Sequence, residues 1–145
     1  MTAQETLARV AECARARDAE GVADAIRAHA DFRWVGVYDV GQTEVAIVAW
    51  SGGGPPAHPR FGRGRGLTSR AIAAGTSVVV GDVTADPDYL EAFGDTRSEA
   101  IVPVTLSGEV VGVIDVESSE LDAFDAADRR FLEACGDAAR PLWSR

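Results

Sequence analysis

The stretch EAIVPVTLSGEVVGVIDVES, residues 99–118, holds two runs rich in β-branched residues on either side of Ser107 and Gly108. Such runs around a two-residue turn predict an antiparallel hairpin, because glycine permits the backbone twist that joins paired strands. FRWVGVYDV (32–40) and TEVAIVAW (43–50) repeat this pattern closer to the N-terminus. Two consecutive hairpins favour one antiparallel sheet.

Helix start signals lie on both sides of these hairpins. Thr2 and Glu5 fit a capping box, Asp18 is placed to cap a second helix, and Asp125 and Asp128 precede a last helical stretch with one apolar face. We therefore predict an α+β fold: a central antiparallel sheet of five to six strands, N- and C-terminal helices packed on one face, and a ligand pocket on the other.

The middle of the chain is less regular. The Gly- and Pro-rich segment 51–66 predicts a loop without core strand, and 67–75 predicts an Ala-rich helix. SVVVGDV (77–83) reads as a short buried strand. DPDYLEAFG (86–94) predicts a short helix that begins with an Asp cap and a proline.

Length and charge limit the classes of function. The 145 residues suit a single globular domain, with a helical segment at 1–30 and the main fold at 31–145. A net charge of −9 argues against nucleic-acid partners and against binding to anionic membranes, which both need a basic surface. No apolar run reaches the roughly 20 residues that span a bilayer, and a cytoplasmic location is the expectation.

Three carboxylates are the strongest candidates for a binding site. Asp115 and Glu117 stand two apart on a predicted strand, so their side chains leave the same face, and Glu99 opens the partner strand. The group forms either a cradle for an ammonium or guanidinium group or a solvated sheet surface. If the three converge, repulsion should raise the pKa of at least one of them.

Several segments together resemble a GAF domain, a small-molecule-binding module of signalling proteins. They are WVGVY (34–38), GRG (64–66), DV (82–83), RSEAIVPV (97–104) and GVIDVES (112–118). Within that family they are similar to the free methionine-(R)-sulfoxide reductase branch. This branch uses cysteine chemistry, and the resemblance aligns its cysteine positions with His58, Thr68 and Ala92.

The resemblance therefore implies that this chain lacks the redox mechanism, since none of these three side chains forms a sulfenic acid or a disulfide. It also implies that Glu99, Asp115 and Glu117 hold the polar end of a ligand and that Trp34 and Tyr38 form an aromatic wall. By periodicity alone the two aromatic residues are equally well placed in the core.

The remaining candidates carry weaker signals. His58, Arg63, Arg65 and Thr68 are candidates for a lid or for anion contacts, since GRGRG precedes a predicted helix N-terminus. The glycines of that motif equally fit a flexible loop. Cys13 and Cys135, on predicted helices, are expected to be small apolar fillers. No metal or cofactor is expected, because ligands at metal spacing are absent from the sequence.

These features predict a small-molecule-binding module for a polar, amine-bearing or amino-acid-like metabolite, with no catalytic residue nominated. The first alternative is a divergent enzyme that uses the carboxylates for acid–base chemistry in the same pocket. The second is an interaction protein without a ligand. A homodimer through the terminal helices and a separate signalling partner are also expected.

Overall fold

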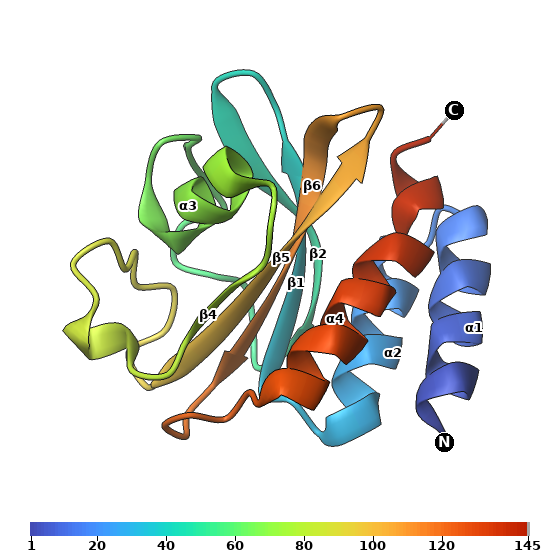
Figure 1. Ribbon diagram of the computed structural model, residues 1–145, viewed down its shortest axis with the longest axis horizontal. Helices are drawn as coiled ribbons and strands as arrows, with labels where there is room; N and C mark the ends of the chain where they lie inside the picture. Colours follow the sequence, from blue (N-terminus) through green and yellow to red (C-terminus); the bar gives the residue numbers. More distant parts are fainter. Residues whose placement is uncertain (145) are drawn as a thin grey trace.

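A six-stranded antiparallel sheet forms the centre of the protein (Figure 1). A computed structural model describes residues 1–144. The strand order is β3-β2-β1-β6-β5-β4. The strands are β1 (Trp34–Val40), β2 (Glu44–Gly52), β3 (Arg60–Gly62), β4 (Val78–Val80), β5 (Ser98–Leu106) and β6 (Glu109–Ser118).

Helices cover the two faces of the sheet unequally. One face carries α1 (Ala3–Arg15), α2 (Ala19–Ala30) and α4 (Ala126–Ala138), and α3 (Gly66–Ala74) lies on the opposite side (Figure 1). Two short 3-10 helices, η1 (Val83–Ala85) and η2 (Arg140–Leu142), complete the regular structure. The predicted α+β architecture is therefore confirmed. Within residues 1–144, no helix is both long and apolar enough to cross a membrane.

The hairpin predicted at 99–118 is present, with β5 and β6 as neighbouring strands of the sheet. Strand β6 pairs with β5 on one side and with β1 on the other. Ser107 and Gly108 both have positive φ angles, 52° and 80°, the backbone conformation that a two-residue hairpin turn needs. This pairing places β6 in the interior of the sheet, where both of its faces are covered.

Side-chain alternation along the strands separates two cores. Val35 and Val37 of β1 point toward the helical layer, whereas Trp34 and Tyr38 belong to the core on the α3 side. Strand β6 follows the same alternation, with Ile114 in the helix-side core. The α3 side is thus the face of the sheet that receives Trp34 and Tyr38.

The predicted helix caps are present at three helices. The Thr2 hydroxyl accepts a hydrogen bond from the backbone N–H of Glu5 at 3.1 Å, within a complete capping box. The Asp125 carboxylate accepts from the N–H of Asp128 at 2.8 Å in a second box, and Asp18 caps α2. These bonds satisfy N–H groups that the first helical turn leaves without partners.

The helix predicted at 86–94 is wrong. The chain forms η1 one turn earlier, capped by Asp82, and then continues without a regular helix. Asp86 instead accepts a hydrogen bond from the N–H of Asp88 at 3.0 Å and pairs with Arg70 of α3. A helix this short is unstable alone, and here the aromatic side chains of Tyr89 and Phe93 pack in the α3-side core.

Two strand predictions also need correction. The strand predicted at 77–83 is shorter, Val78–Val80, and half-buried, because it forms the edge of the sheet with a single partner. The segment 51–66 is not wholly loop: β2 continues to Gly52, and the short strand β3 pairs with the edge of β2. The apolar run Val78–Val80 predicts a strand but does not tell that it pairs on one side only, and the letters of β3 (Arg60–Gly62) carry no apolar run at all.

Gly36 offers a test of the packing on the α3 side. A Cβ atom at this position would stand 2.3 Å from Cη2 of Trp34, which is fully buried and unable to swing away. We expect Gly36→Ala to lower the free energy of unfolding by about 1–3 kcal/mol, measured by urea denaturation. Gly64→Ala, where nothing lies within 4 Å, is the matched control and should change stability by less than about 0.5 kcal/mol. Equal stability of the two variants would contradict this packing.

Candidate functional site

The structure brings Glu99, Asp115 and Glu117 together on the α3 side of the sheet. Glu99 of β5 lies directly opposite Glu117 of β6, and Asp115 lies one pleat further along the same face. One carboxylate oxygen from each residue lies within 4.8 Å of the others. The three side chains are only 6 %, 5 % and 1 % exposed, which excludes a solvated sheet surface.

The three carboxyl groups line a small cavity of about 30 Å³. This volume has room for about one or two water molecules. The cavity is enclosed by apolar side chains as well as by His58, Thr68 and Ala92; the apolar ones are Phe61, Leu67, Leu90 and Ile101. The site is therefore a pocket whose lining is half apolar and half polar, and three of its polar residues are acidic.

Two irregular segments cover this cavity. His58 comes from the Gly- and Pro-rich segment 53–59, and Leu90 and Ala92 come from the segment 86–97. The backbone N–H of Ala57 donates to the carbonyl of Ala92 at 3.2 Å, which joins the two segments. Thr68 reaches the cavity from the first turns of α3.

The positions that the resemblance aligned with the reductase cysteines, His58, Thr68 and Ala92, all line the cavity. Within residues 1–144, no cysteine lies on its wall. Cys13 and Cys135 are buried in the helix-side core, across the sheet, as expected for apolar fillers. Burial raises the pKa of the Cys135 thiol to about 12, so this group is a thiol near neutral pH.

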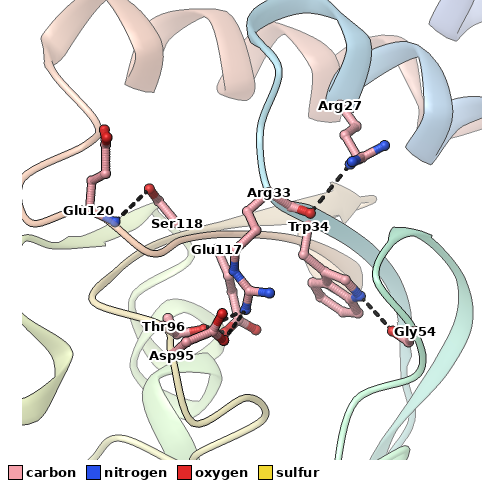
Figure 2. A network of polar contacts seen from close by, with 9 residues as sticks. All are labelled: Arg27, Arg33, Trp34, Gly54, Asp95, Thr96, Glu117, Ser118 and Glu120. Atoms are coloured by element: carbon pink, nitrogen blue, oxygen red, sulfur yellow. Dashed lines mark hydrogen bonds and ion pairs between the residues drawn. The ribbon is translucent and has the colours of Figure 1, made fainter.

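Trp34 and Tyr38 lie behind the cavity wall and are fully or nearly fully buried. The Trp34 ring packs against Phe93 at 5.1 Å between centroids, and Tyr38 packs edge-on against Phe61 at 5.9 Å. The indole Nε1–H of Trp34 donates to the carbonyl of Gly54 at 2.9 Å (Figure 2). The two residues are thus core members that support the covering segments and the lining residue Phe61.

Arg63 and Arg65 are not brought to the cavity. The Arg63 guanidinium donates to the carbonyl of Gly41 at 2.8 Å, at the β1–β2 turn. Arg65 occupies the N-cap position of α3 and makes no capping hydrogen bond with its side chain. Of the four candidates for a lid or anion contact, only His58 and Thr68 line the pocket.

Sequence reasoning missed a polar chain that ends on Glu117 (Figure 2). The Arg33 guanidinium donates to the Thr96 hydroxyl at 3.0 Å and pairs with Asp95 at 3.2 Å. The Thr96 hydroxyl is 2.8 Å from Oε1 of Glu117. Arg33 and Thr96 are 63 residues apart and neither belongs to a motif, so no sequence signal links them.

The donor and acceptor groups of Arg33, Thr96 and Glu117 set the direction of the hydrogen bonds between them. Arginine is only a donor, so the Thr96 hydroxyl accepts from Arg33 and gives its own proton to Oε1 of Glu117. Oε1 is therefore an acceptor. The second oxygen, Oε2 of Glu117, and Oδ1 of Asp115 are buried and have no hydrogen-bond partner among the described residues.

The environment raises the pKa of all three carboxyl groups. Burial, followed by the charge of Glu117, raises the pKa of Glu99 to about 8. Burial and the charge of Asp115 raise the pKa of Glu117 to about 9, against the opposing effects of Thr96 and Arg33. Burial and Glu99 raise the pKa of Asp115 well above its usual value. The three groups thus hold protons at pH values where exposed carboxylates are ionised.

The same three oxygens define the one group of potential metal ligands among residues 1–144. Carboxylate oxygens suit hard cations such as Mg²⁺ or Ca²⁺, but Ca²⁺ takes six to eight oxygen ligands and this wall supplies three. The high pKa values also disfavour the ionised ligands that a metal needs.

Comparison with known proteins assigns the family. A family model for the GAF domain matches residues 17–140. The chain belongs to the GAF domain family. It is 33 % identical over 111 residues to GAF domain-containing protein A from Dictyostelium discoideum, a match that covers 77 % of this chain and 70 % of that protein.

Two further relatives are free methionine-R-sulfoxide reductases. The enzyme from Saccharomyces cerevisiae is 30 % identical over 105 residues, which is 71 % of this GAF domain and 58 % of the yeast protein. The crystal structure of the Neisseria meningitidis enzyme in complex with its substrate superposes with a TM-score of 0.86 at 28 % identity, over 97 % of this chain and 87 % of that one. The predicted family and its relation to these reductases are confirmed.

The raised pKa values predict an unusual dependence of stability on pH. Because the folded protein binds more protons than the unfolded chain above pH 4.5, the free energy of unfolding should fall as the pH rises from about 5 to about 9. Urea denaturation at several pH values measures this slope. Glu117→Gln should make it shallower, whereas Glu109→Gln, at the exposed start of β6, should leave it unchanged. A flat profile for the unmodified protein would show that the carboxyl groups are not protonated.

Thr96 provides a test of the polar chain. Thr96→Val keeps the shape of the side chain but removes the hydroxyl, so Oε1 of Glu117 loses its donor and Arg33 loses an acceptor. We expect a loss of about 1–3 kcal/mol in the free energy of unfolding. Thr96→Ser retains the hydroxyl and should recover most of this loss. Equal losses in both variants would indicate a packing role only.

Proposed function

We propose that this GAF domain binds a small polar metabolite that carries an ammonium or guanidinium group. The observation that carries the proposal is the convergence of three buried carboxyl groups on one cavity, with one oxygen each of Asp115 and Glu117 left without a partner. A buried carboxylate is costly unless it is paired or hydrogen-bonded. A ligand with several N–H donors and one positive charge would supply the opposite charge and the hydrogen bonds that these carboxylates need.

The rest of the cavity suits an amino-acid-like molecule. Half of the residues that line the cavity are apolar, among them Phe61, Leu67 and Leu90, and would contact the aliphatic part of such a ligand. An aromatic ring beside the cavity adds a favourable contact for a cation. At about 30 Å³ the cavity holds only the charged head, so the covering segments 53–59 and 86–97 must move apart to admit a whole amino acid.

We further propose binding without cysteine-based reduction. Two relatives are named as free methionine-R-sulfoxide reductases, but reduction of a sulfoxide by a thiol needs a reactive cysteine at the ligand. In this chain Cys13 and Cys135 are buried on the other side of the sheet. A role as a sensor or binding module is consistent with this separation. The homodimer, the signalling partner and the cytoplasmic location expected from the sequence stay predictions.

A second candidate function is acid–base catalysis on an amine or amino acid in the same cavity. It is favoured by the pKa values of Glu99 and Glu117, about 8 and 9, which allow proton transfer near neutral pH. Asp115 lies beside both groups and would serve as the relay between them. Under this alternative, ligand binding would be followed by formation of a product.

Thermal unfolding against a ligand panel tests the proposed binding. The panel contains free amino acids, both epimers of methionine sulfoxide, polyamines and cyclic nucleotides. A ligand at 100 times its Kd should stabilise the protein by about 2.7 kcal/mol, a shift of several degrees in Tm. Amine-bearing compounds should give the shift, and Glu99→Gln should abolish it.

The controls separate binding from the two alternatives. Glu109→Gln, which removes an exposed carboxylate at the start of β6, should respond like the unmodified protein. If mass spectrometry detects conversion of the bound compound into a product, the result would favour the acid–base enzyme over the binding module. A panel with no shift for any amine would contradict the proposed function.

A further inference from the structure

Two buried oxygens at the cavity need hydrogen atoms that the protein does not supply. Oε2 of Glu117 and Oδ1 of Asp115 have no donor among the described residues. Oε1 of Glu117 already accepts from Thr96, so this residue has one oxygen left to face the cavity. A buried carboxyl oxygen without a hydrogen-bond partner lowers the stability of the folded protein, and two such oxygens on one wall lower it further.

Within residues 1–144, no basic side chain is hydrogen-bonded to these oxygens. Arg33 is the basic residue of the network, and its hydrogen bond goes to Thr96 rather than to a carboxylate of the wall. The other titratable groups near the wall come from β1, β5 and the two covering segments. They are Tyr38 from β1, Glu99 from β5, and Tyr89 from the segment 86–97, with His58 at the opposite side of the cavity and Asp95 on the outer side of Arg33.

Besides a water molecule, for which the cavity has room, hydrogen can reach the two oxygens in two ways. Either the carboxyl groups are protonated and share their own O–H groups, or a ligand directs N–H groups at them. Both arrangements place hydrogen at the same positions on the same wall. A proton and a ligand N–H group therefore compete for each site.

We propose that cation binding at this wall is a proton exchange, in which the N–H groups of the ligand displace one carboxyl proton from the pair Asp115 and Glu117. The inference rests on the proposed function and specifies how that site recognises charge. In each exchange an O–H bond of a carboxyl group breaks, its proton leaves to solvent, and the carboxylate accepts an N–H group of the ligand. One cation enters for each proton released, so the net charge of the buried wall stays constant.

This exchange explains how an acidic wall is stable in a buried cavity. In the free protein the protons remove the charge that burial opposes. In the bound protein the ligand takes over the same role. The raised pKa values of Glu99 and Glu117, about 8 and 9, agree with a wall that holds protons near neutral pH.

The affinity for a cation should therefore depend on pH. Its direction is opposite to the one expected when the ligand's own amine loses its proton as the pH rises. As the pH rises toward about 8, fewer protons compete, so the affinity for a permanently charged ligand should increase. The increase is about tenfold per pH unit for each proton released. An ordinary exposed carboxylate site is fully ionised above about pH 6 and would show no such increase.

Carboxyl-carbon NMR with methylguanidinium as the probe tests the exchange. A guanidinium group stays charged throughout the range, so any pH dependence comes from the protein. The ¹³C shifts of Asp and Glu side chains report protonation, and titration at pH 6, 7 and 8 gives the affinity. We expect protonated carboxyl groups for Asp115 and Glu117 in the free protein at pH 7, loss of one proton from this pair on binding, and an affinity that rises about tenfold per pH unit.

A pair of variants assigns the effect to the wall. Glu117→Gln removes one exchangeable proton and should reduce the slope of affinity against pH, while Glu109→Gln at the exposed start of β6 should retain it. If Glu117→Gln destabilises the fold, the carboxyl shifts of the unmodified protein still decide the question.

The remaining outcomes separate this inference from the proposed function. Ionised Asp115 and Glu117 in the free protein at pH 7, or an affinity independent of pH, would overturn the exchange while a metabolite that shifts Tm still supports binding. Failure of methylguanidinium to bind at any pH would also overturn it. A panel in which no amine binds would overturn the proposed function itself.

Discussion

The antiparallel pairing of β6 with both β1 and β5 is the constraint on which the rest of the structure depends. Strand β6 is interior to the sheet, and it is buried on both faces from Gly112 to Glu117. Ile114 and Val116 enter the core beneath the helices, and the alternation then directs Asp115 and Glu117 to the other face. The two carboxyl groups are buried because they lie in this covered part of the strand.

The cover over that face comes from irregular chain rather than from regular elements. The segments 53–59 and 86–97 are fastened to the sheet by the Trp34–Gly54 hydrogen bond and by the contacts of Arg33 with Asp95 and Thr96. Arg33 also lies 4.8 Å from the centre of the Phe93 ring. One arginine thus holds the covering segment and, through Thr96, one carboxyl group of the wall. The cover and the acidic wall are parts of one connected structure.

Membership of the GAF family explains the frame, and this chain's own residues modify the pocket. The cavity wall carries His58, Thr68 and Ala92, while the two thiols lie across the sheet. An acidic wall without a reactive sulfur supports the proposed cation binding and the proposed proton exchange. Both proposals rest on the burial of carboxyl groups beside one another.

Much of the frame was readable from the sequence, because its signals are local. The hairpin turn at Ser107-Gly108, the capping boxes of Thr2 and Asp125, and the alternation along β6 each depend on residues a few positions apart. The same alternation put Asp115 and Glu117 on one face, with Glu99 on the neighbouring strand. The edge strands and the segment 86–94 were misjudged, since one-sided pairing and packing onto a core leave no period in the sequence.

The sequence by itself therefore determined the strands, the principal helices and the shared face of two carboxylates, because backbone geometry repeats every two or 3.6 residues. Only the tertiary structure decided that these carboxylates are buried, that Arg33 and Thr96 lie beside Glu117, and that Arg63 and Arg65 lie away from the cavity. These features depend on contacts between segments that are tens of residues apart in the sequence. Such contacts set the burial and the pKa of the carboxyl groups, so no local sequence pattern predicts them.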